Sequence, residues 1–149
     1  IYTDILFHGQ DLQGIRQILA CTPEGMLAEL DTAPAPSAWI QKPPRNHWIA
    51  DPLVLDCAFQ MASLWCYEET GCVSLPSYSA SYRQYCRRFP SHPVQAVLSV
   101  QDVSRHKFVG NVTFLDQNGS VLAQITGYEA VMEDRLIQAF KPERYASGR

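Results

Sequence analysis

The chain has 149 residues, which is enough for one domain with a sizeable core. Hydrophobic residues make up 46% and charged residues 18%, a balance typical of a globular protein and not of a disordered one. The formal net charge is −3, and the basic residues form only short groups such as Arg87–Arg88 and Arg105–Lys107. Composition therefore gives no electrostatic basis for binding nucleic acid or an anionic membrane.

Cysteine content and the chain ends indicate the cellular setting. The five cysteines include no pair with C-x-x-C spacing, which argues against a disulfide framework or a zinc site. No signal peptide opens the chain and no apolar run reaches membrane length, so we expect a reducing, cytoplasmic compartment. The first residue is Ile1 and the tail KPERYASGR is polar. We therefore expect a piece of a longer polypeptide, with one domain over residues 1–140 and a polar linker over 141–149.

The N-terminal third contains one clear strand pattern. LFHGQDLQGIRQIL (6–19) has Gly9 and Gly14 around a short polar turn, and we expect a loop or a single helical turn there. GMLAELD (25–31) alternates Met26, Ala28 and Leu30 with polar or small neighbours, which predicts a strand. TAPAPSAWIQKPP (32–44) contains four prolines and predicts a surface loop and not a helix.

The apolar stretch DPLVLDCAFQMASLW (51–65) predicts a long buried helix. Asp51 is a good N-cap, Pro52 suits the first helical position and Gly71 ends the segment, so we expect a helix over Asp51–Tyr67. A strand of this length would be too long for a chain of this size.

After Gly71 the pattern changes to strands. SYSASYRQYCRRF (77–89) and VQAVLSVQDV (94–103) are strand-like, and alternate residues from Phe108 to Phe114 share one face. QNGS (117–120) is a hairpin signal. In the following strand we expect Val121, Ala123 and Ile125 to share one face. The order of one strand, a long buried helix and about four antiparallel strands predicts an α+β domain, a single hot-dog fold in which a curved sheet wraps one central helix.

The predicted helix carries an unexpected polar stripe. Asp56, Gln60, Ser63 and Tyr67 are spaced by four, three and four residues, which places them on one face. Every other position from Leu53 to Cys66 is apolar, so we expect burial on nearly all sides. An unpaired polar group in a core costs roughly 1–3 kcal/mol. The stripe therefore either meets structural hydrogen-bond partners or lines a pocket, where burial would favour the protonated carboxyl group that a general acid needs.

The combination of motifs resembles the C-terminal half of the dehydratase domain of polyketide synthases and of polyunsaturated fatty acid synthases. LFHGQDLQGI is followed by DPLVLDCAFQ and then by LPSYSASYRQY, in the order that this family shows. The matching positions are Gly9, Gln13, Pro52, Leu55, Asp56, Gln60, Leu75 and Pro76. The order of several motifs over most of the chain is more specific than any one of them.

Four positions depart from the family pattern. The family's aromatic residue before the glycine is His8 here, its proline is Gln10, its phenylalanine is Leu12 and its histidine before the helix proline is Asp51. Because these positions are expected to flank the pocket, the pocket's shape or its substrate is expected to differ from the common pattern.

The family's catalytic histidine motif, His-x-x-x-Gly-x-x-x-x-Pro, is absent from this sequence. His106 with Gly110 is the nearest formal match, but Leu115 stands at the proline position. We expect His47 and His92 on the surface, which leaves His8 as the one histidine in a stretch expected to line the pocket.

The resemblance implies dehydration of a β-hydroxyacyl thioester carried on the phosphopantetheine arm of an acyl carrier protein, without a metal or organic cofactor. Asp56 would be the acid and Gln60 would position it. The base would come from the missing histidine, and backbone N–H groups at the helix N-terminus would polarise the thioester oxygen. Substrate contacts are expected from His8, Gly9, Ser63, Leu75 and Pro76. The implied partners are the carrier protein, other synthase domains, and a second hot-dog repeat or a homodimer partner.

Two other functions remain open from the sequence. The chain is alternatively an inactive pseudo-dehydratase that serves as a structural, dimerisation or acyl-binding module, because the histidine motif is missing. A hot-dog thioesterase or hydratase acting as a homodimer is a third hypothesis. A structural carboxylate at Asp56 with no catalytic role is the simplest interpretation of the stripe.

Overall fold

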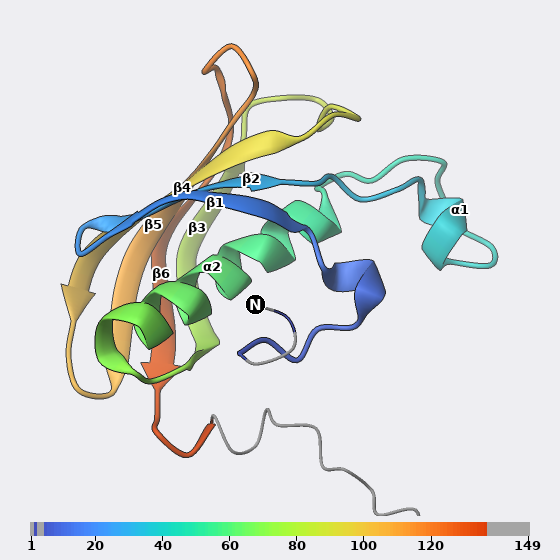
Figure 1. The fold of residues 1–149 in the computed structure, drawn as a ribbon. Coiled ribbons are helices and arrows are strands. Elements are labelled where there is room, and N and C mark those ends of the chain that lie inside the picture. The colour runs from blue at the N-terminus through green and yellow to red at the C-terminus, as the bar shows by residue number, and fades with distance from the viewer. Residues whose placement is uncertain (1, 3–4, 137–149) are drawn as a thin grey trace, which may run out of the picture.

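A long helix lies in the concave face of a curved antiparallel sheet in the computed structural model, which describes residue 2 and residues 5–136 (Figure 1). The six strands are ordered β1-β2-β4-β5-β6-β3. The strands are β1 (Ile15–Thr22), β2 (Gly25–Leu30), β3 (Ser74–Gln84), β4 (Val94–Val103), β5 (Lys107–Leu115) and β6 (Val121–Met132). The helices are the 3-10 turn η1 (Gln10–Leu12), α1 (Pro36–Trp39) and α2 (Pro52–Thr70). This arrangement confirms the hot-dog prediction, while the predicted linker at 141–149 lies outside the described residues.

The central helix α2 begins and ends at the residues that the sequence indicates. The Asp51 carboxylate accepts a hydrogen bond from the backbone N–H of Val54 and caps the helix, and Pro52 occupies the first turn. Gly71 ends the helix with φ of 75°, a left-handed conformation that glycine adopts at little cost. The helix is one turn longer than predicted because nothing breaks it between Tyr67 and Gly71.

Alternating side chains on the sheet form the core against α2. Met26, Ala28 and Leu30 of β2 are buried, as are Phe108 and Phe114 of β5. On the helix side the buried residues include Val54, Cys57, Ala58, Met61, Ala62 and Trp65. The predicted alternation in β2 and β5 is thus confirmed, since period-two burial is what one apolar sheet face requires.

The predicted face of β6 is only partly right. Ala123 and Ile125 are buried, but Val121 is exposed. A β-bulge opposite Asn111 of β5 shifts the register between Ile125 and Tyr128. The face that points to the core therefore changes from odd-numbered to even-numbered residues, so that Tyr128, Ala130 and Met132 are buried. Sequence periodicity over the whole strand does not reveal this change.

Three element predictions need correction. Ile15–Thr22 is a strand and not part of the N-terminal loop, because it pairs with β2 in the tertiary fold. The proline-rich loop contains one helical turn, α1. Strand β3 starts at Ser74 and includes Pro76, which an edge strand tolerates because no ladder hydrogen bond is lost on its open side.

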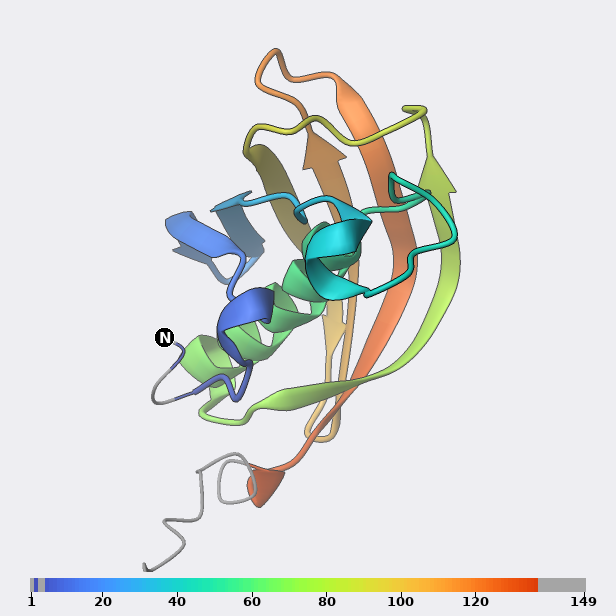
Figure 2. The ribbon, with the colours of Figure 1, turned by 90° about the vertical axis from the view of Figure 1, so that its right-hand side faces the viewer.

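The N-terminal segment crosses the side of α2 that the sheet leaves open (Figure 2). At Gly14 it packs against α2, and the Gly14 backbone carbonyl accepts a hydrogen bond from the N–H of Asp31 at 2.8 Å. A Cβ at Gly14 would lie 2.6 Å from Cys57 Sγ and 2.7 Å from Leu53 Cγ. The helix α2 is therefore packed between the sheet and the N-terminal segment. The absence of a side chain at Gly14 allows that segment to lie so close to the helix.

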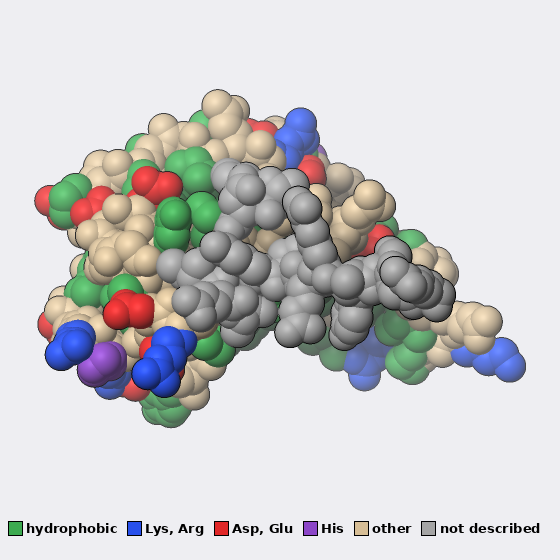
Figure 3. Space-filling model, turned by 60° about the horizontal axis from the view of Figure 1, so that its bottom comes forward, with side chains coloured by type: hydrophobic (Ala, Val, Ile, Leu, Met, Phe, Trp, Pro, Cys, Tyr) green, Lys and Arg blue, Asp and Glu red, His purple; other side chains and the backbone are tan. Residues whose placement is uncertain are grey.

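The surface carries mixed charge. On the face shown in Figure 3, acidic and basic side chains alternate with apolar ones, and neither sign dominates the part formed by described residues. None of the helices in the described part of the chain combines the length and apolarity needed to cross a bilayer.

Replacing Gly14 with alanine should lower the free energy of unfolding by about 1–3 kcal/mol, the usual cost of overpacking. The added methyl group would clash with Cys57 and Leu53 on α2. Gly9→Ala is the matched control, because a Cβ there meets nothing within 4 Å. Urea denaturation of both variants checks this, and equal stabilities would contradict the close packing at Gly14.

Candidate functional site

A cavity of about 120 Å³ opens between α2, the segment before η1 and the start of β3. Its lining is apolar apart from a few polar side chains. The lining residues are Leu6, Phe7, His8, Asp56, Phe59, Gln60, Ser63, Ser74, Leu75 and Pro76. The cavity therefore lies on the polar stripe of α2, where the sequence places the candidate acid.

Three of the four stripe residues line this cavity, namely Asp56, Gln60 and Ser63, while Tyr67 does not. The expectation of burial on nearly all sides is wrong for Asp56, because its side chain is 31% exposed to solvent. The exposure arises at the open mouth of the cavity. The carboxylate is thus reachable by a ligand and is not sealed in the core.

The side chain of Gln60 is fixed by hydrogen bonds at both ends. Its Nε2 donates to Asp56 Oδ2 at 2.7 Å and to the backbone carbonyl of Leu12 at 2.8 Å. Its Oε1 accepts from the Tyr2 hydroxyl at 2.8 Å. These contacts fix the orientation of the buried amide, which in turn holds one oxygen of the Asp56 carboxyl group.

Tyr2 completes this network from outside the helix. Its hydroxyl oxygen accepts from the backbone N–H of Ile15 at 2.9 Å while its O–H donates to Gln60. Burial raises the pKa of Tyr2 to about 12, against the opposing effect of the Ile15 N–H. The hydroxyl therefore stays protonated at neutral pH and acts as a donor.

His8 faces the same carboxyl group. Its Nε2 lies 3.4 Å from Asp56 Oδ2, and the side chain is 13% exposed. Its ring stacks on Phe7 with centroids 4.6 Å apart. Burial lowers the pKa of His8 below its usual value, and the negative charge of Asp56 acts in the opposite direction. A largely buried imidazole thus lies at ion-pair distance from the candidate acid.

The two oxygens of Asp56 differ in their surroundings. Oδ2 receives the Gln60 amide and faces His8, whereas Oδ1 has no hydrogen-bond partner among the described residues. Oδ2 is thus already engaged by the Gln60 amide, which leaves Oδ1 as the oxygen without a partner in the described part of the chain. That oxygen is the one left for a ligand hydroxyl group.

The far wall of the cavity is formed where β3 leaves α2. The Ser63 hydroxyl accepts from the backbone N–H of Ser74 at 3.3 Å, and the Ser74 hydroxyl is buried without a partner among the described residues. Leu75 and Pro76 follow and supply apolar surface. Of the expected substrate contacts, His8, Ser63, Leu75 and Pro76 lie on this cavity, whereas Gly9 does not line it.

The helix N-terminus does not reach this cavity, which corrects the expected role of its backbone N–H groups. The Asp51 carboxylate accepts a hydrogen bond from the N–H of Val54 at 2.9 Å. It also accepts from the N–H of Ala33, which lies 3.1 Å from Oδ1 and 2.9 Å from Oδ2. Burial raises the pKa of Asp51, while these N–H groups act in the opposite direction. Asp51 therefore joins the helix to the preceding loop and does not flank the Asp56 cavity.

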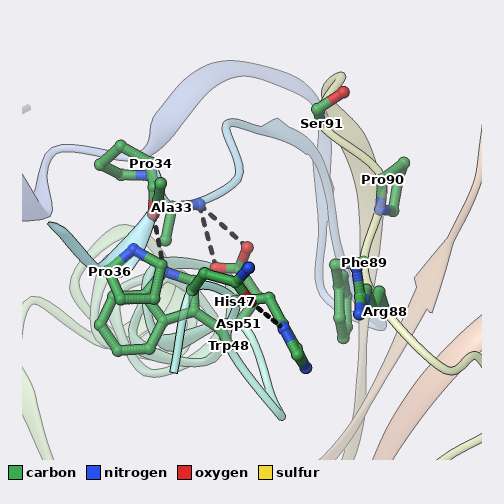
Figure 4. A pocket seen from close by; sticks show the side chains of 12 residues that line it. Ala33, Pro34, Pro36, His47, Trp48, Asp51, Arg88, Phe89, Pro90 and Ser91 are labelled. Atoms are coloured by element: carbon green, nitrogen blue, oxygen red, sulfur yellow. Dashed lines mark hydrogen bonds between the residues drawn. The ribbon is translucent and has the colours of Figure 1, made fainter. Parts of the chain in front are cut away.

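A second cavity, of about 160 Å³, surrounds that N-terminus (Figure 4). Figure 4 shows Asp51 turned toward the N–H of Ala33, with Trp48 beside it and Arg88 and Phe89 on the opposite wall. The indole N–H of Trp48 donates to the carbonyl of Pro34 at 2.7 Å. Since the polar groups at its centre already bond backbone atoms, we assign this cavity a structural role.

Sequence analysis missed Tyr2, Leu6, Phe7, Phe59 and Ser74 as members of the site. Phe59 follows Asp56 by three residues and shares its helix face, so the spacing contained that signal. No pattern in the sequence indicates that Tyr2 reaches Gln60 across 58 positions of the chain. No cluster of three or more metal-ligating side chains occurs among the described residues.

The sheet wrapped on one helix defines a hot-dog protein, and the site places a carboxyl group and an amide of that helix at a mostly apolar cavity. A family model described as the polyketide synthase dehydratase N-terminal domain matches residues 2–139. The chain belongs to the polyketide synthase dehydratase family. No curated protein matches the chain. The model's description names an N-terminal domain, so the placement in a C-terminal half stays a prediction.

Solved dehydratase structures share the fold. The dehydratase domain from the CurJ module of the curacin synthase is 18% identical with a TM-score of 0.67, over 89% of this chain and 44% of that chain. The PpsC dehydratase domain of Mycobacterium tuberculosis, in complex with C12:1-CoA, is 24% identical to this chain with a TM-score of 0.64. The match covers 85% of this chain and 46% of the PpsC chain. An inactive Asp-to-Asn mutant of the CurK dehydratase is 21% identical to this chain with a TM-score of 0.63. The match covers 85% of this chain and 42% of the CurK chain. The chain thus spans less than half of each.

Replacing Asp51 with alanine should lower the free energy of unfolding by about 2 kcal/mol, because the N–H groups of Val54 and Ala33 lose their acceptor. Asp51→Asn keeps one acceptor oxygen and should cost less. Thermal or urea denaturation measures both, and an unchanged stability of the alanine variant would contradict the capping role.

Replacing Asp56 with asparagine should lower the pKa of His8 further below its usual value of about 6.5, because the raising effect of the carboxylate is lost while burial remains. The His8 ring would then lose its proton at a lower pH than in the unmodified chain. NMR titration of the imidazole ring protons gives the measurement. Asp11→Asn in the exposed turn η1 is the control and should leave the titration unchanged. A rise in the His8 pKa in the Asp56 variant would contradict the pairing.

Proposed function

We propose that this chain is a dehydratase-type domain of a polyketide or fatty acid synthase that supplies the acid half of the site dehydrating β-hydroxyacyl thioesters. The observation that carries the proposal is the Asp56 carboxyl group at an apolar cavity, held through Oδ2 by Gln60. One oxygen is fixed and the other stays available to a ligand. This is the arrangement that proton donation to a departing hydroxyl group requires.

Membership of the dehydratase family supports the reaction class. The similar PpsC domain was seen with an acyl thioester, C12:1-CoA, and an Asp-to-Asn substitution gives an inactive CurK dehydratase. A carboxyl group whose replacement by the isosteric amide inactivates an enzyme acts through its proton or its charge. Asp56 is the candidate for that role here.

In the proposed reaction a base removes the proton on the carbon next to the thioester carbonyl. Asp56 gives a proton to the β-hydroxyl group, water leaves, and an α,β-unsaturated acyl chain results. Gln60 positions Asp56, while His8, Ser63, Leu75 and Pro76 contact the acyl chain. The acyl group arrives on the phosphopantetheine arm of an acyl carrier protein, and no metal or organic cofactor takes part.

The proposed partners are the carrier protein, other synthase domains, and a second hot-dog repeat or a second copy of the chain. Both β1 and β3 lie at edges of the sheet and leave backbone groups open to pairing. The chain spans less than half of the dehydratase structures that it matches, which leaves room for a second repeat in such proteins. In this proposal the base comes from that other repeat.

A pseudo-dehydratase that binds acyl chains without chemistry is the second candidate. The observation that favours it is the missing His-x-x-x-Gly-x-x-x-x-Pro motif. The partial match at His106 and Gly110 lies at the β4–β5 turn and in β5, away from the cavity. Binding of an acyl thioester with no turnover in the natural full-length protein would favour this second candidate.

Replacing Asp56 with asparagine in the natural full-length protein should reduce dehydration of a 3-hydroxyacyl carrier-protein thioester by about 10²-fold or more, the usual contribution of a general acid. Formation of the enoyl thioester, followed by mass spectrometry, gives the rate, and circular dichroism confirms the fold. Asp11→Asn serves as the matched control, because Asp11 is exposed and outside the cavity. Retained turnover in the Asp56 variant would reject the acid role.

A further inference from the structure

We propose that the Asp56 cavity selects short acyl chains and that the ring of Phe59 sets the length limit. This inference rests on the proposed function and deepens it, because it names the class of β-hydroxyacyl thioester that the site takes. The observation behind it is a cavity of only about 120 Å³ whose wall includes an aromatic ring packed on the buried core. The length limit follows from the volume of the cavity and from what lies behind that ring.

The volume of the cavity limits the number of carbon atoms that it can hold. An apolar protein cavity of about 150 Å³ accommodates one molecule of benzene. By this comparison, a cavity of about 120 Å³ holds roughly five carbon atoms. A longer acyl chain must therefore displace part of the lining or leave its end outside.

The position of Asp56 decides which end of the acyl chain enters the cavity. Its carboxyl group lies at the mouth, and in the proposed reaction it gives a proton to the β-hydroxyl group. The thioester is joined to the long pantetheine arm and stays on the solvent side of that group. The carbons beyond the β-carbon therefore point inward, past Phe59 and toward Ser63, which lies roughly 10 Å further along α2.

Phe59 forms the wall that these inner carbons meet. It follows Asp56 by three residues and precedes Ser63 by four, so the three side chains share one face of α2, and all three line the cavity. The ring of Phe59 packs on Tyr128 of β6, with centroids 5.2 Å apart and planes inclined by 31°. Phe59 thus lies between the cavity and the core.

The core behind Phe59 is filled by further aromatic rings. Tyr128 is 1% exposed and packs on Phe108 of β5, with centroids 6.1 Å apart. Phe108 packs in turn on Trp65 of α2, with centroids 5.4 Å apart. Close-packed interiors leave few voids into which a side chain can move. A longer acyl chain would have to displace this whole group of rings in order to push Phe59 aside.

The neighbouring walls are also fixed. Leu6 is buried, and the amide of Gln60 is held by its three hydrogen bonds. Ser63 and Ser74 are buried and joined by the hydrogen bond from the Ser74 N–H to the Ser63 hydroxyl. Each of these walls is held by its own packing or hydrogen bonds, so the cavity keeps its size when an acyl chain enters.

The test compares kcat/KM of the natural full-length protein for the 3-hydroxyhexanoyl and 3-hydroxydecanoyl thioesters of pantetheine. The hexanoyl substrate should be preferred by about 10²-fold or more, because one excess methylene group already costs about tenfold or more in an apolar pocket. Phe59→Ala should raise the decanoyl-to-hexanoyl ratio at least about tenfold, since it removes the ring. Phe59→Leu keeps an apolar side chain against Tyr128 and should raise the ratio less; it decides the question if the alanine variant does not fold.

Phe89→Ala is the matched control. Phe89 is half-buried and packs edge-on against Phe114, with centroids 6.2 Å apart, but it does not line the Asp56 cavity. This variant removes the same atoms and should leave the decanoyl-to-hexanoyl ratio unchanged. Equal changes of the ratio in Phe59→Ala and Phe89→Ala would overturn the role of Phe59. Equal use of both substrates by the unmodified protein would overturn the length limit.

A binding measurement distinguishes this inference from the proposed function. Hexanoyl- and decanoyl-pantetheine carry no β-hydroxyl group, so their Kd values for the chain report on the cavity and not on the reaction. Titration followed by NMR of the His8 and Phe59 ring signals gives these values, and the hexanoyl thioester should bind at least about tenfold more tightly.

The possible outcomes point in different directions. Preferential binding of the hexanoyl thioester, with no dehydration by the natural full-length protein, would keep the length limit and reject the proposed function. Dehydration that is lost in Asp56→Asn but equally fast for both chain lengths would keep the proposed function and reject the length limit. Equal binding of the two thioesters, or binding of neither, would also reject the length limit.

Discussion

The site depends on one hydrogen-bonded amide. Gln60 is buried inside α2, and its Nε2 and Oε1 together bond Asp56, the carbonyl of Leu12 and the hydroxyl of Tyr2. A buried amide that lacked these partners would destabilise the core by roughly 1–3 kcal/mol. With them it connects the helix to the segment that crosses it. The position of the N-terminal segment therefore satisfies the hydrogen-bonding groups of this buried side chain.

That crossing segment is also what brings His8 to Asp56. Gly14 allows it to lie against Leu53 and Cys57, and η1 carries the Leu12 carbonyl that Gln60 bonds. His8 comes just before this turn and is turned into the cavity. The packing of the N-terminal segment against α2 and the approach of His8 to Asp56 thus depend on the same segment. A change in that packing would alter the separation of His8 and Asp56 without any change in either residue.

The two carboxylates of α2 show how position along one helix separates structure from chemistry. Asp51 at the N-terminus is buried and bonds backbone N–H groups with both oxygens. Asp56, little more than one turn later, has one oxygen bonded and one oxygen open to the cavity. The first joins two segments, and the second leaves one oxygen accessible from the cavity.

The sequence by itself determined the features that have a local cause. The capping of α2 by Asp51, its end at Gly71, the alternation in β2 and β5, and the stripe that places Asp56 on the face of Gln60 follow from helix and strand periodicity. Tertiary structure decided the rest. It made Ile15–Thr22 a strand by pairing it with β2, and it changed the buried face of β6 through a bulge. It also brought Tyr2 and His8 to the helix, because contacts between distant segments depend on how the whole chain packs and leave no periodic trace in the sequence.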